Sequence, residues 1–196
     1  YVPVIDGRLA ALDARTGKVV WQSQVSSVAD SYTLTMAPRI AKGKVIIGVA
    51  GGEFPTRGYF DAYDAASGKR LWRFYTVPGD PSKPFENDAL KRASATWSGD
   101  FWRMGGGGSV WDAISYDPDA DLIYVGVGNA GPYPDALRSS KVQDNLYVCS
   151  IVAVKSDTGK LKWYFQSVPG DSWDYDANQQ MTLADLTIQG RKRKVL

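Results

Sequence analysis

The sequence contains no histidine and only one cysteine among its 196 residues. The missing histidine excludes Ser-His-Asp triads, histidine general bases, and zinc or haem sites ligated by histidine from within this chain. Any catalytic base in the chain must therefore be a carboxylate, a lysine or a tyrosine. The lone Cys149 cannot close an internal disulfide, and its place in the apolar run from Leu146 to Val154 predicts a small buried side chain.

A strong net charge and a long hydrophobic run are also missing. The 23 Lys and Arg residues nearly balance the 21 Asp and Glu residues, which gives no reason to expect nucleic acid or an anionic membrane as the main partner. No apolar run is long enough to span a membrane, and no secretory signal is present. With 44% hydrophobic residues, residues 1–196 can form one domain. The strand-like start without Met predicts an internal piece of a longer protein.

Tryptophan and glycine are abundant, and they occur in a repeat. The motif A-x-D-x-x-(T/S)-G-K-x-x-W starts at Ala11, Ala62 and Ala153, with Lys155 replacing the aspartate in the third copy. The copies are 51 and 91 residues apart. Blades of a β-propeller repeat roughly every 40–50 residues, so these offsets correspond to about one and two blades.

The motif has a direct structural interpretation. D-x-x-T-G is typical of a tight turn, in which Gly supplies a positive φ and the Asp and Thr side chains bond to the local backbone. The Trp then lies at a fixed place on the leaving strand, where its ring can pack between neighbouring sheets. Apolar β-branched runs surround the motifs. The sequence therefore predicts an all-β fold, a β-propeller segment of roughly four blades.

Two polar insertions interrupt this pattern, at residues 78–100 and 130–145. A short helix is expected within residues 84–95. Both insertions are too long for simple hairpins, and loops of this length usually carry function or cover a site.

Three further segments, together with the Trp motif, give the chain a family resemblance. They are G-G-E-F-P-T-R-G-Y from Gly51 to Tyr59, G-G-G-G-S-V-W-D from Gly105 to Asp112, and G-V-G-N-A-G-P from Gly126 to Pro132, followed by P-G-D-S-W-D. In order and spacing they resemble the quinoprotein alcohol dehydrogenases that use pyrroloquinoline quinone (PQQ), the methanol/ethanol dehydrogenase family. The resemblance implies about four blades of an eight-bladed propeller with Trp-docking motifs.

A cation site is implied by the same resemblance. Taken alone, Glu53 and Asn129 read as ordinary turn residues. In a propeller, however, equivalent strand ends converge on the central channel, and a carboxylate and an amide oxygen meeting there suit a hard cation such as calcium. The resemblance makes Glu53 and Asn129 metal ligands, with Asp174 and Asp176 also in the ligand set.

The glycine run before Trp111 has two interpretations. Glycines allow close backbone approach, and the simpler interpretation is a flexible loop followed by a core tryptophan. The resemblance instead makes Trp111 a flat surface that stacks on the PQQ ring. It also assigns Thr35, Ala50, Gly51 and Gly52 to the edge of the quinone.

The stretch V-P-G-D-S-W-D-Y-D, from Val168 to Asp176, combines negative charge with aromatic surface. If Trp173 to Asp176 is extended, Asp174 and Asp176 point one way and Trp173 and Tyr175 the other. Because no histidine is available, a carboxylate here is the expected base, and the resemblance assigns that role to Asp174. Asp171 is expected to be a turn residue.

Asp176 bears on the identity of the cation. Calcium-dependent relatives often have a small or neutral residue two places after the base, whereas lanthanide-dependent relatives have Asp. A further carboxylate adds repulsion that a trivalent ion offsets better than a divalent one. Calcium and a lanthanide therefore both remain candidates.

Two functions from different classes remain at this stage. The resemblance implies a periplasmic enzyme that oxidises a small alcohol to the aldehyde and passes electrons to a cytochrome c, with a homodimer among its expected assemblies. The alternative is a non-catalytic propeller scaffold of the outer-membrane assembly type, which shares the Trp repeat. A scaffold has no use for Glu53, Asn129, Trp111 and Asp174 together, which favours the enzyme.

Overall fold

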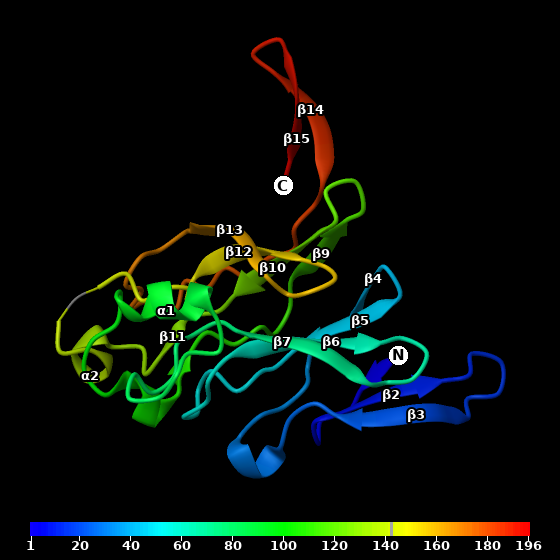
Figure 1. The fold of residues 1–196 in the computed structure, drawn as a ribbon, viewed down its shortest axis with the longest axis horizontal. Coiled ribbons are helices and arrows are strands. Elements are labelled where there is room, and N and C mark those ends of the chain that lie inside the picture. Colours follow the sequence, from blue (N-terminus) through cyan, green and yellow to red (C-terminus); the bar gives the residue numbers. More distant parts are fainter. Residues whose placement is uncertain (142) are drawn as a thin grey trace.

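In the computed structural model, which describes residues 1–141 and 143–196, most of the chain forms antiparallel sheets (Figure 1). The first sheet has three strands, β1 (Val2–Pro3), β2 (Arg8–Leu12) and β3 (Val19–Gln24). The second has four, β4 (Arg39–Ala41), β5 (Lys44–Gly48), β6 (Tyr59–Asp64) and β7 (Arg70–Tyr75). The third has four, β9 (Ile114–Asp117), β10 (Leu122–Val127), β12 (Ser150–Lys155) and β13 (Leu161–Gln166). The hairpin of β14 (Ala184–Ile188) and β15 (Arg191–Val195) projects from the rest in Figure 1.

The remaining elements are short. They are the 3-10 turns η1 (Val28–Asp30) and η2 (Phe101–Met104), the paired strands β8 (Gly106–Gly107) and β11 (Ala130–Gly131), and the helices α1 (Asp88–Ser94) and α2 (Asp135–Arg138). α1 is the helix expected within residues 84–95, and α2 lies in the second insertion. No helix among the described residues has the length and apolar character needed to cross a membrane.

The all-β propeller prediction is confirmed, and its blade count can now be stated by strand. Strands of each complete blade pair in chain order, β4-β5-β6-β7 and β9-β10-β12-β13. The three-stranded sheet pairs in the same chain order, β1-β2-β3, and β14 and β15 form a two-stranded antiparallel hairpin. The roughly four blades are therefore two complete sheets and two partial ones.

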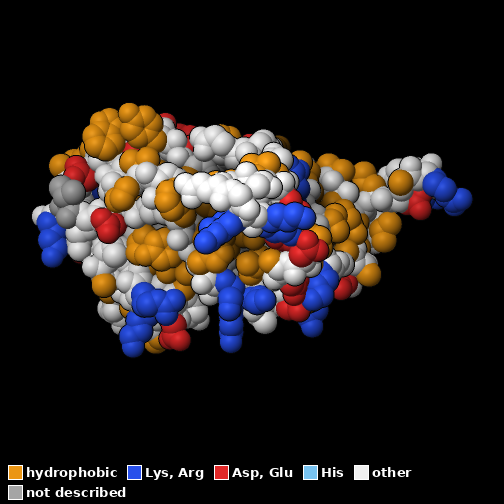
Figure 2. All heavy atoms as spheres, turned by 90° about the horizontal axis from the view of Figure 1, so that it is seen from above, with side chains coloured by type: hydrophobic (Ala, Val, Ile, Leu, Met, Phe, Trp, Pro, Cys, Tyr) orange, Lys and Arg blue, Asp and Glu red, His pale blue; other side chains and the backbone are white. Residues whose placement is uncertain are grey.

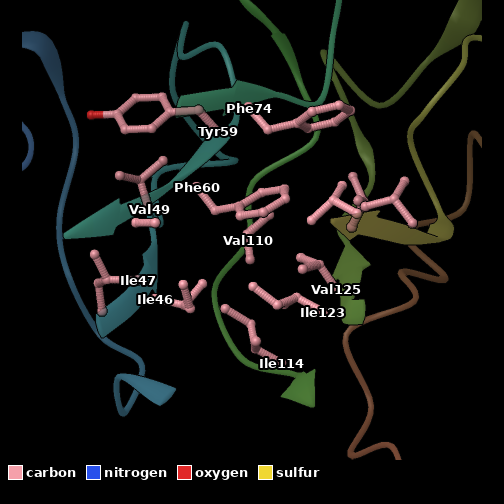
Figure 3. Packing of buried hydrophobic residues seen from close by; sticks show 14 of the residues in the cluster. Ile46, Ile47, Val49, Tyr59, Phe60, Phe74, Val110, Ile114, Ile123 and Val125 are labelled. Carbon is pink, nitrogen blue, oxygen red and sulfur yellow. The ribbon is translucent and has the colours of Figure 1, made fainter. Parts of the chain in front are cut away.

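The main core lies between the two four-stranded sheets. Ile46 and Phe60 of one sheet face Ile123 and Val125 of the other, and Val110 lies between them (Figure 3). All five side chains are fully buried. Burying one such side chain contributes roughly 1.5–3 kcal/mol relative to leaving it in water, so this contact fixes the spacing of the blades.

Two of the three repeated tryptophans, Trp21 and Trp72, join one sheet to the next. Trp21 Nε1 donates a hydrogen bond to the Ala65 carbonyl (3.1 Å), and Trp72 Nε1 donates to the Ser156 carbonyl (3.1 Å). Each acceptor lies in the T/S-G turn of the following motif. Trp163, the third copy, is 41% exposed and stacks on Tyr124 of its own sheet, with ring centroids 5.5 Å apart.

The motif glycine is required because the docked ring lies directly over it. Gly159 has a φ of +65°, and a Cβ there would lie 2.6 Å from Cε3 of Trp72. Gly68 has the same relation to Trp21, at 2.5 Å. The equivalent Gly17 has open space around it. A bare turn is thus the receiving surface for the ring of the preceding blade.

Charged side chains of both signs are mixed on one face of the molecule. The face shown in Figure 2 carries acidic and basic groups side by side. The sequence has 23 basic and 21 acidic residues, and those on this face are not separated into regions of one sign.

The docking contact makes a prediction about stability. We expect Gly159→Ala to lower the free energy of unfolding of the intact protein by roughly 1–3 kcal/mol more than Gly43→Ala. Gly43 has a similar φ of +74° but open space around it, so both variants share the backbone cost and only Gly159→Ala displaces an indole. Urea unfolding measures the difference. Equal losses for the two variants would contradict the docking role.

Candidate functional site

The glycine run, residues 105–108, packs closely against two other backbone segments, and we call this contact the backbone crossing. Residues 105–108 all have positive φ, between +69° and +86°. The Gly58 N–H donates to the Gly107 carbonyl (2.7 Å), and the Gly108 N–H donates to the Asn129 carbonyl (2.7 Å). A Cβ at Gly107 would overlap the backbone of β11. The flexible-loop interpretation is therefore wrong, because these glycines join the loop after β5 to the loop after β10 at van der Waals distance.

A cavity of about 440 Å³ lies beside this crossing, and twelve residues line it. All nine residues that the sequence analysis assigned to the cofactor, the cation or the base are among them. They are Thr35, Ala50, Gly51, Gly52, Glu53, Trp111, Asn129, Asp174 and Asp176. The structure thus brings together side chains that are up to 141 positions apart in the sequence, from Thr35 to Asp176.

Glu53 reaches the cavity through a compact turn after β5. Thr33 and Ala50 pair as an isolated antiparallel bridge, with N···O distances of 3.0 and 3.3 Å. The Phe54 N–H then donates to the Gly51 carbonyl (3.0 Å), and Gly51 has a φ of +129°. The bridge and the turn hold the exposed Glu53 side chain at the edge of the cavity.

Asn129 is 4% exposed and is held from both sides. Its Nδ2 donates to the Ala130 carbonyl (3.1 Å), and its backbone N–H donates to Asp176 Oδ1 (2.5 Å). With Nδ2 engaged, Oδ1 is directed toward Gly52, 3.7 Å from where a Cβ on that glycine would lie. The side chain therefore presents an oxygen, not its N–H groups, to the region of Gly52.

The Asp171–Asp176 loop does not have the extended conformation that the sequence analysis considered for Trp173 to Asp176. Asp174 and Asp176 both have left-handed backbone conformations, with φ of +64° and +55°. Both still line the cavity, while Trp173 and Tyr175 are 68% and 62% exposed with ring centroids 6.0 Å apart. The predicted division into acidic and aromatic sides holds, but left-handed residues produce it instead of strand alternation.

Asp171 is the turn residue that the sequence predicted. It is 1% exposed, and its carboxylate accepts hydrogen bonds from the backbone N–H groups of Trp173 (3.1 Å) and Tyr175 (3.3 Å). These two bonds close the loop on either side of Asp174, which is thereby held toward the cavity.

The electrostatics of the cavity are those of crowded acids. Burial, followed by repulsion from Asp171 and Glu53, raises the pKa of Asp174. Burial also raises the pKa of Asp176; the Asn129 N–H opposes this rise and the Asp174 charge adds to it. No Lys or Arg is among the twelve lining residues. When its carboxylates are ionised, the cavity therefore carries negative charge that no lining Lys or Arg compensates.

The acids do not form a closed metal cage by themselves. Within residues 1–141 and 143–196, no three His, Cys, Asp or Glu side chains converge closely enough to hold an ion. The donor types are nonetheless carboxylates and an amide oxygen, which suit a hard cation. An ion here would need oxygen from the amide, or from a bound molecule, in addition to the acids.

Three lining residues were not identified from the sequence: Thr33, Phe54 and Ser109. Ser109 lies two positions before Trp111, with the buried Val110 between them pointing into the core. Thr33 lies two positions before Thr35 in the same way. Alternation in these extended segments would have identified both residues. Phe54 follows Glu53 in a turn, where no periodicity could have identified it.

Comparison with known proteins places the chain among quinoproteins. The family model for the PQQ glucose/ethanol/alcohol dehydrogenase β-propeller domain matches residues 1–196. The quinohemoprotein alcohol dehydrogenase ADH IIB of Pseudomonas putida is 56% identical over all of this chain and 29% of its own length. The quinohemoprotein alcohol dehydrogenase of Comamonas testosteroni is 54% identical over all of this chain and 28% of its own length. The chain thus spans less than a third of these relatives.

Solved structures agree with the sequence comparison. The crystal structure of the Comamonas testosteroni enzyme superposes with a TM-score of 0.95 at 52% identity, over 99% of this chain and 29% of that one. A europium-containing methanol dehydrogenase superposes with a TM-score of 0.86 at 38% identity, over 98% of this chain and 34% of that one. By sequence and by structure, the chain belongs to the family of PQQ glucose/ethanol/alcohol dehydrogenase β-propeller domains.

Proposed function

We propose that the intact protein is a PQQ-dependent alcohol dehydrogenase that oxidises a small alcohol to the aldehyde. One observation carries this proposal: the nine residues named from separate motifs line a single cavity. Their chemistry is complementary, with an indole, a wall of small residues, an amide oxygen and three carboxylates. The relatives named as quinohemoprotein alcohol dehydrogenases support the same reaction class.

The residues after β5 and the indole would hold the cofactor. When bound there, PQQ and its cation would supply the acceptor for the hydride of the alcohol. Trp111, which is 40% exposed, offers a flat apolar face for a planar ring. Ala50, Gly51 and Gly52 offer a wall with almost no side chain, and Thr35 offers a hydroxyl at its edge.

The acids and the amide would hold the cation. Glu53, Asn129 and Asp174 supply oxygens, and Asp176 adds a further carboxylate whose Oδ1 already accepts the Asn129 N–H. Mutual repulsion of these acids favours a high positive charge among them. Calcium satisfies the donor types, and a lanthanide offsets the extra carboxylate better. We propose that Asp176 shifts the preference toward a lanthanide.

Asp174 would act as the base for the alcohol proton. Its carboxylate lines the cavity, where a carboxylate can accept the hydroxyl proton of an alcohol. The chain has no histidine to take this role. A cytochrome c would receive the electrons, and the periplasm is the expected compartment, as in the family that the chain resembles.

The first prediction from this proposal concerns reconstitution. Adding PQQ and a cation to the intact metal-free protein should red-shift the quinone absorbance and produce alcohol-dependent dye reduction. Asp174→Asn should keep most of the absorbance change and lower kcat by roughly a hundredfold or more, because the base is lost while the cofactor wall remains. If no absorbance change occurs in the unmodified protein, the enzyme proposal fails and a propeller scaffold is favoured.

The second prediction concerns the cation. Titration of the metal-free protein with PQQ and either calcium or a light lanthanide should give activity with the lanthanide. Asp176→Ala should weaken lanthanide-dependent activation by roughly tenfold or more relative to calcium, since one carboxylate is removed. Full activation of the unmodified protein by calcium alone would rule out the lanthanide preference.

The third prediction concerns the metal-free protein. The pKa of Asp176 is higher in the folded state than in an unfolded chain, so the folded state binds its proton more tightly. This group therefore makes the protein less stable as pH rises through the raised folded pKa, and that loss is relieved as pH falls toward about 4. Asp176→Asn should raise stability at neutral pH and reduce this pH dependence.

Asp13→Asn is a matched control with the opposite sign. The Thr16 hydroxyl and backbone N–H groups lower the pKa of Asp13, so its ionised form favours folding. Urea unfolding of both variants at pH 5 and pH 7, without metal, measures the two effects. A loss of stability for Asp176→Asn at pH 7 would contradict the repulsion described for the cavity.

A further inference from the structure

A buried arginine outside the cavity is bonded to neutral oxygens. Arg138, the last residue of α2, is only 2% exposed. Its Nη1 donates to the carbonyls of Pro132 and Tyr133, both at 2.7 Å, and its Nη2 donates to the carbonyl of Asp171 at 3.0 Å. Asn145 Oδ1 accepts from Nε (3.2 Å) and Nη2 (3.1 Å). All five guanidinium N–H donors are thereby used.

This environment is unusual for a buried cation. No described carboxylate lies within ion-pair distance of Arg138. Burying a charge is costly unless it is paired or well hydrogen-bonded, and here carbonyl and amide oxygens meet that requirement. The guanidinium links two segments of the chain. Its acceptors are Pro132, Tyr133 and Asn145 in one segment and Asp171 in the other.

A continuous series of hydrogen bonds leads from Arg138 to the proposed base. Arg138 holds the Asp171 backbone through its carbonyl. The Asp171 carboxylate in turn holds the backbone N–H groups of Trp173 and Tyr175, the two neighbours of Asp174. Two further bonds join the same segments: the Gly170 N–H donates to the Asp144 carbonyl (3.0 Å), and the Asp135 N–H donates to Ser172 Oγ (3.2 Å).

The backbone of this loop needs such support. Asp174 and Asp176 have positive φ, a conformation that is unfavourable for most residues other than glycine. At the far end, the Asn129 N–H holds Asp176 Oδ1. Asp174 is therefore held between two fixed points, and Arg138 supplies the one on its N-terminal side.

We propose that Arg138 is a positioning residue that fixes the Asp171–Asp176 loop and thereby keeps the Asp174 carboxylate directed into the cavity. The chemical consequence rests on the proposed function, in which Asp174 is the base. The positioning itself does not depend on that function, because it is a property of the loop in the protein without cofactor.

Hydrogen exchange tests the positioning directly. In the intact, cofactor-free protein, Arg138→Lys should make the backbone amides of Trp173 and Tyr175 exchange roughly tenfold faster or more, since a fixed five-donor fork is replaced by a three-donor ammonium. Amides of β5 and β10 should exchange at the unmodified rate. Asn145→Gly, which preserves the φ of +57° but removes the shared acceptor, should produce a smaller change of the same kind.

Arg73→Lys is the matched control. Arg73 is a partly buried arginine that donates to Asp61 within the second sheet and makes no hydrogen bond to the loop. This variant should leave the Trp173 and Tyr175 exchange rates unchanged. Unchanged exchange of these amides in both Arg138→Lys and Asn145→Gly, or an equal increase throughout the protein, would overturn the proposal.

Turnover tests the chemical consequence. After reconstitution with PQQ and a cation, Arg138→Lys should keep quinone binding, measured by absorbance, and keep KM for alcohol within about twofold. The kcat per bound quinone should fall roughly tenfold to a hundredfold, as expected for a misplaced catalytic group. An unchanged kcat alongside faster exchange would overturn the link to Asp174. If the unmodified protein has no activity but the exchange result holds, the proposed function fails while the positioning role stands.

Discussion

The close backbone approach at residues 105–108 is the constraint on which the site depends. There the glycine run bonds to the Gly58 N–H on one side and to the Asn129 carbonyl on the other, with no room for a side chain between them. Those bonds bring the turn that carries Glu53 and the segment that carries Trp111 to the same wall. The core between the sheets sets the distance between them. The contacts of the glycine run then determine which residues line the cavity.

The cavity is a place where the fold carries unfavourable interactions. Acids that repel one another, two of them on left-handed backbone, are held by hydrogen bonds to Asn129, to Asp171 and, through Asp171, to Arg138. Perturbed acids and strained backbone commonly gather at functional sites, because surrounding structure must over-determine them. In this cavity, the hydrogen bonds named above are the surrounding structure that holds the acids in place. The rest of the chain supports the site with buried aliphatic side chains between the sheets and with the docked indoles of Trp21 and Trp72.

Much of this could be predicted from the sequence because the signals are local and repeated. The D-x-x-T-G turn and the Trp that follows it predict a blade and its junction, and the G-G-E and G-N-A-G-P segments mark strand ends that face one cavity. The conformation of the Asp171–Asp176 loop could not be predicted in this way. It is determined by long-range bonds from Asn129 and Arg138, so the alternation rule gave the correct sides with the wrong backbone. Arg138 itself lies in a polar insertion, where nothing in the local pattern distinguishes a buried arginine from a solvated one.

The docking of each indole onto the next turn gives the blade series a direction. The second sheet, for example, offers the ring of Trp72 to the next turn and receives Trp21 on its own bare turn at Gly68. Such a head-to-tail contact is heterologous, so it is saturated only when the series closes on itself. The two docked pairs, Trp21 on Gly68 and Trp72 on Gly159, follow the same order along the chain. Closing such a series would therefore cover every indole and every bare turn, which serves solubility as well as shape.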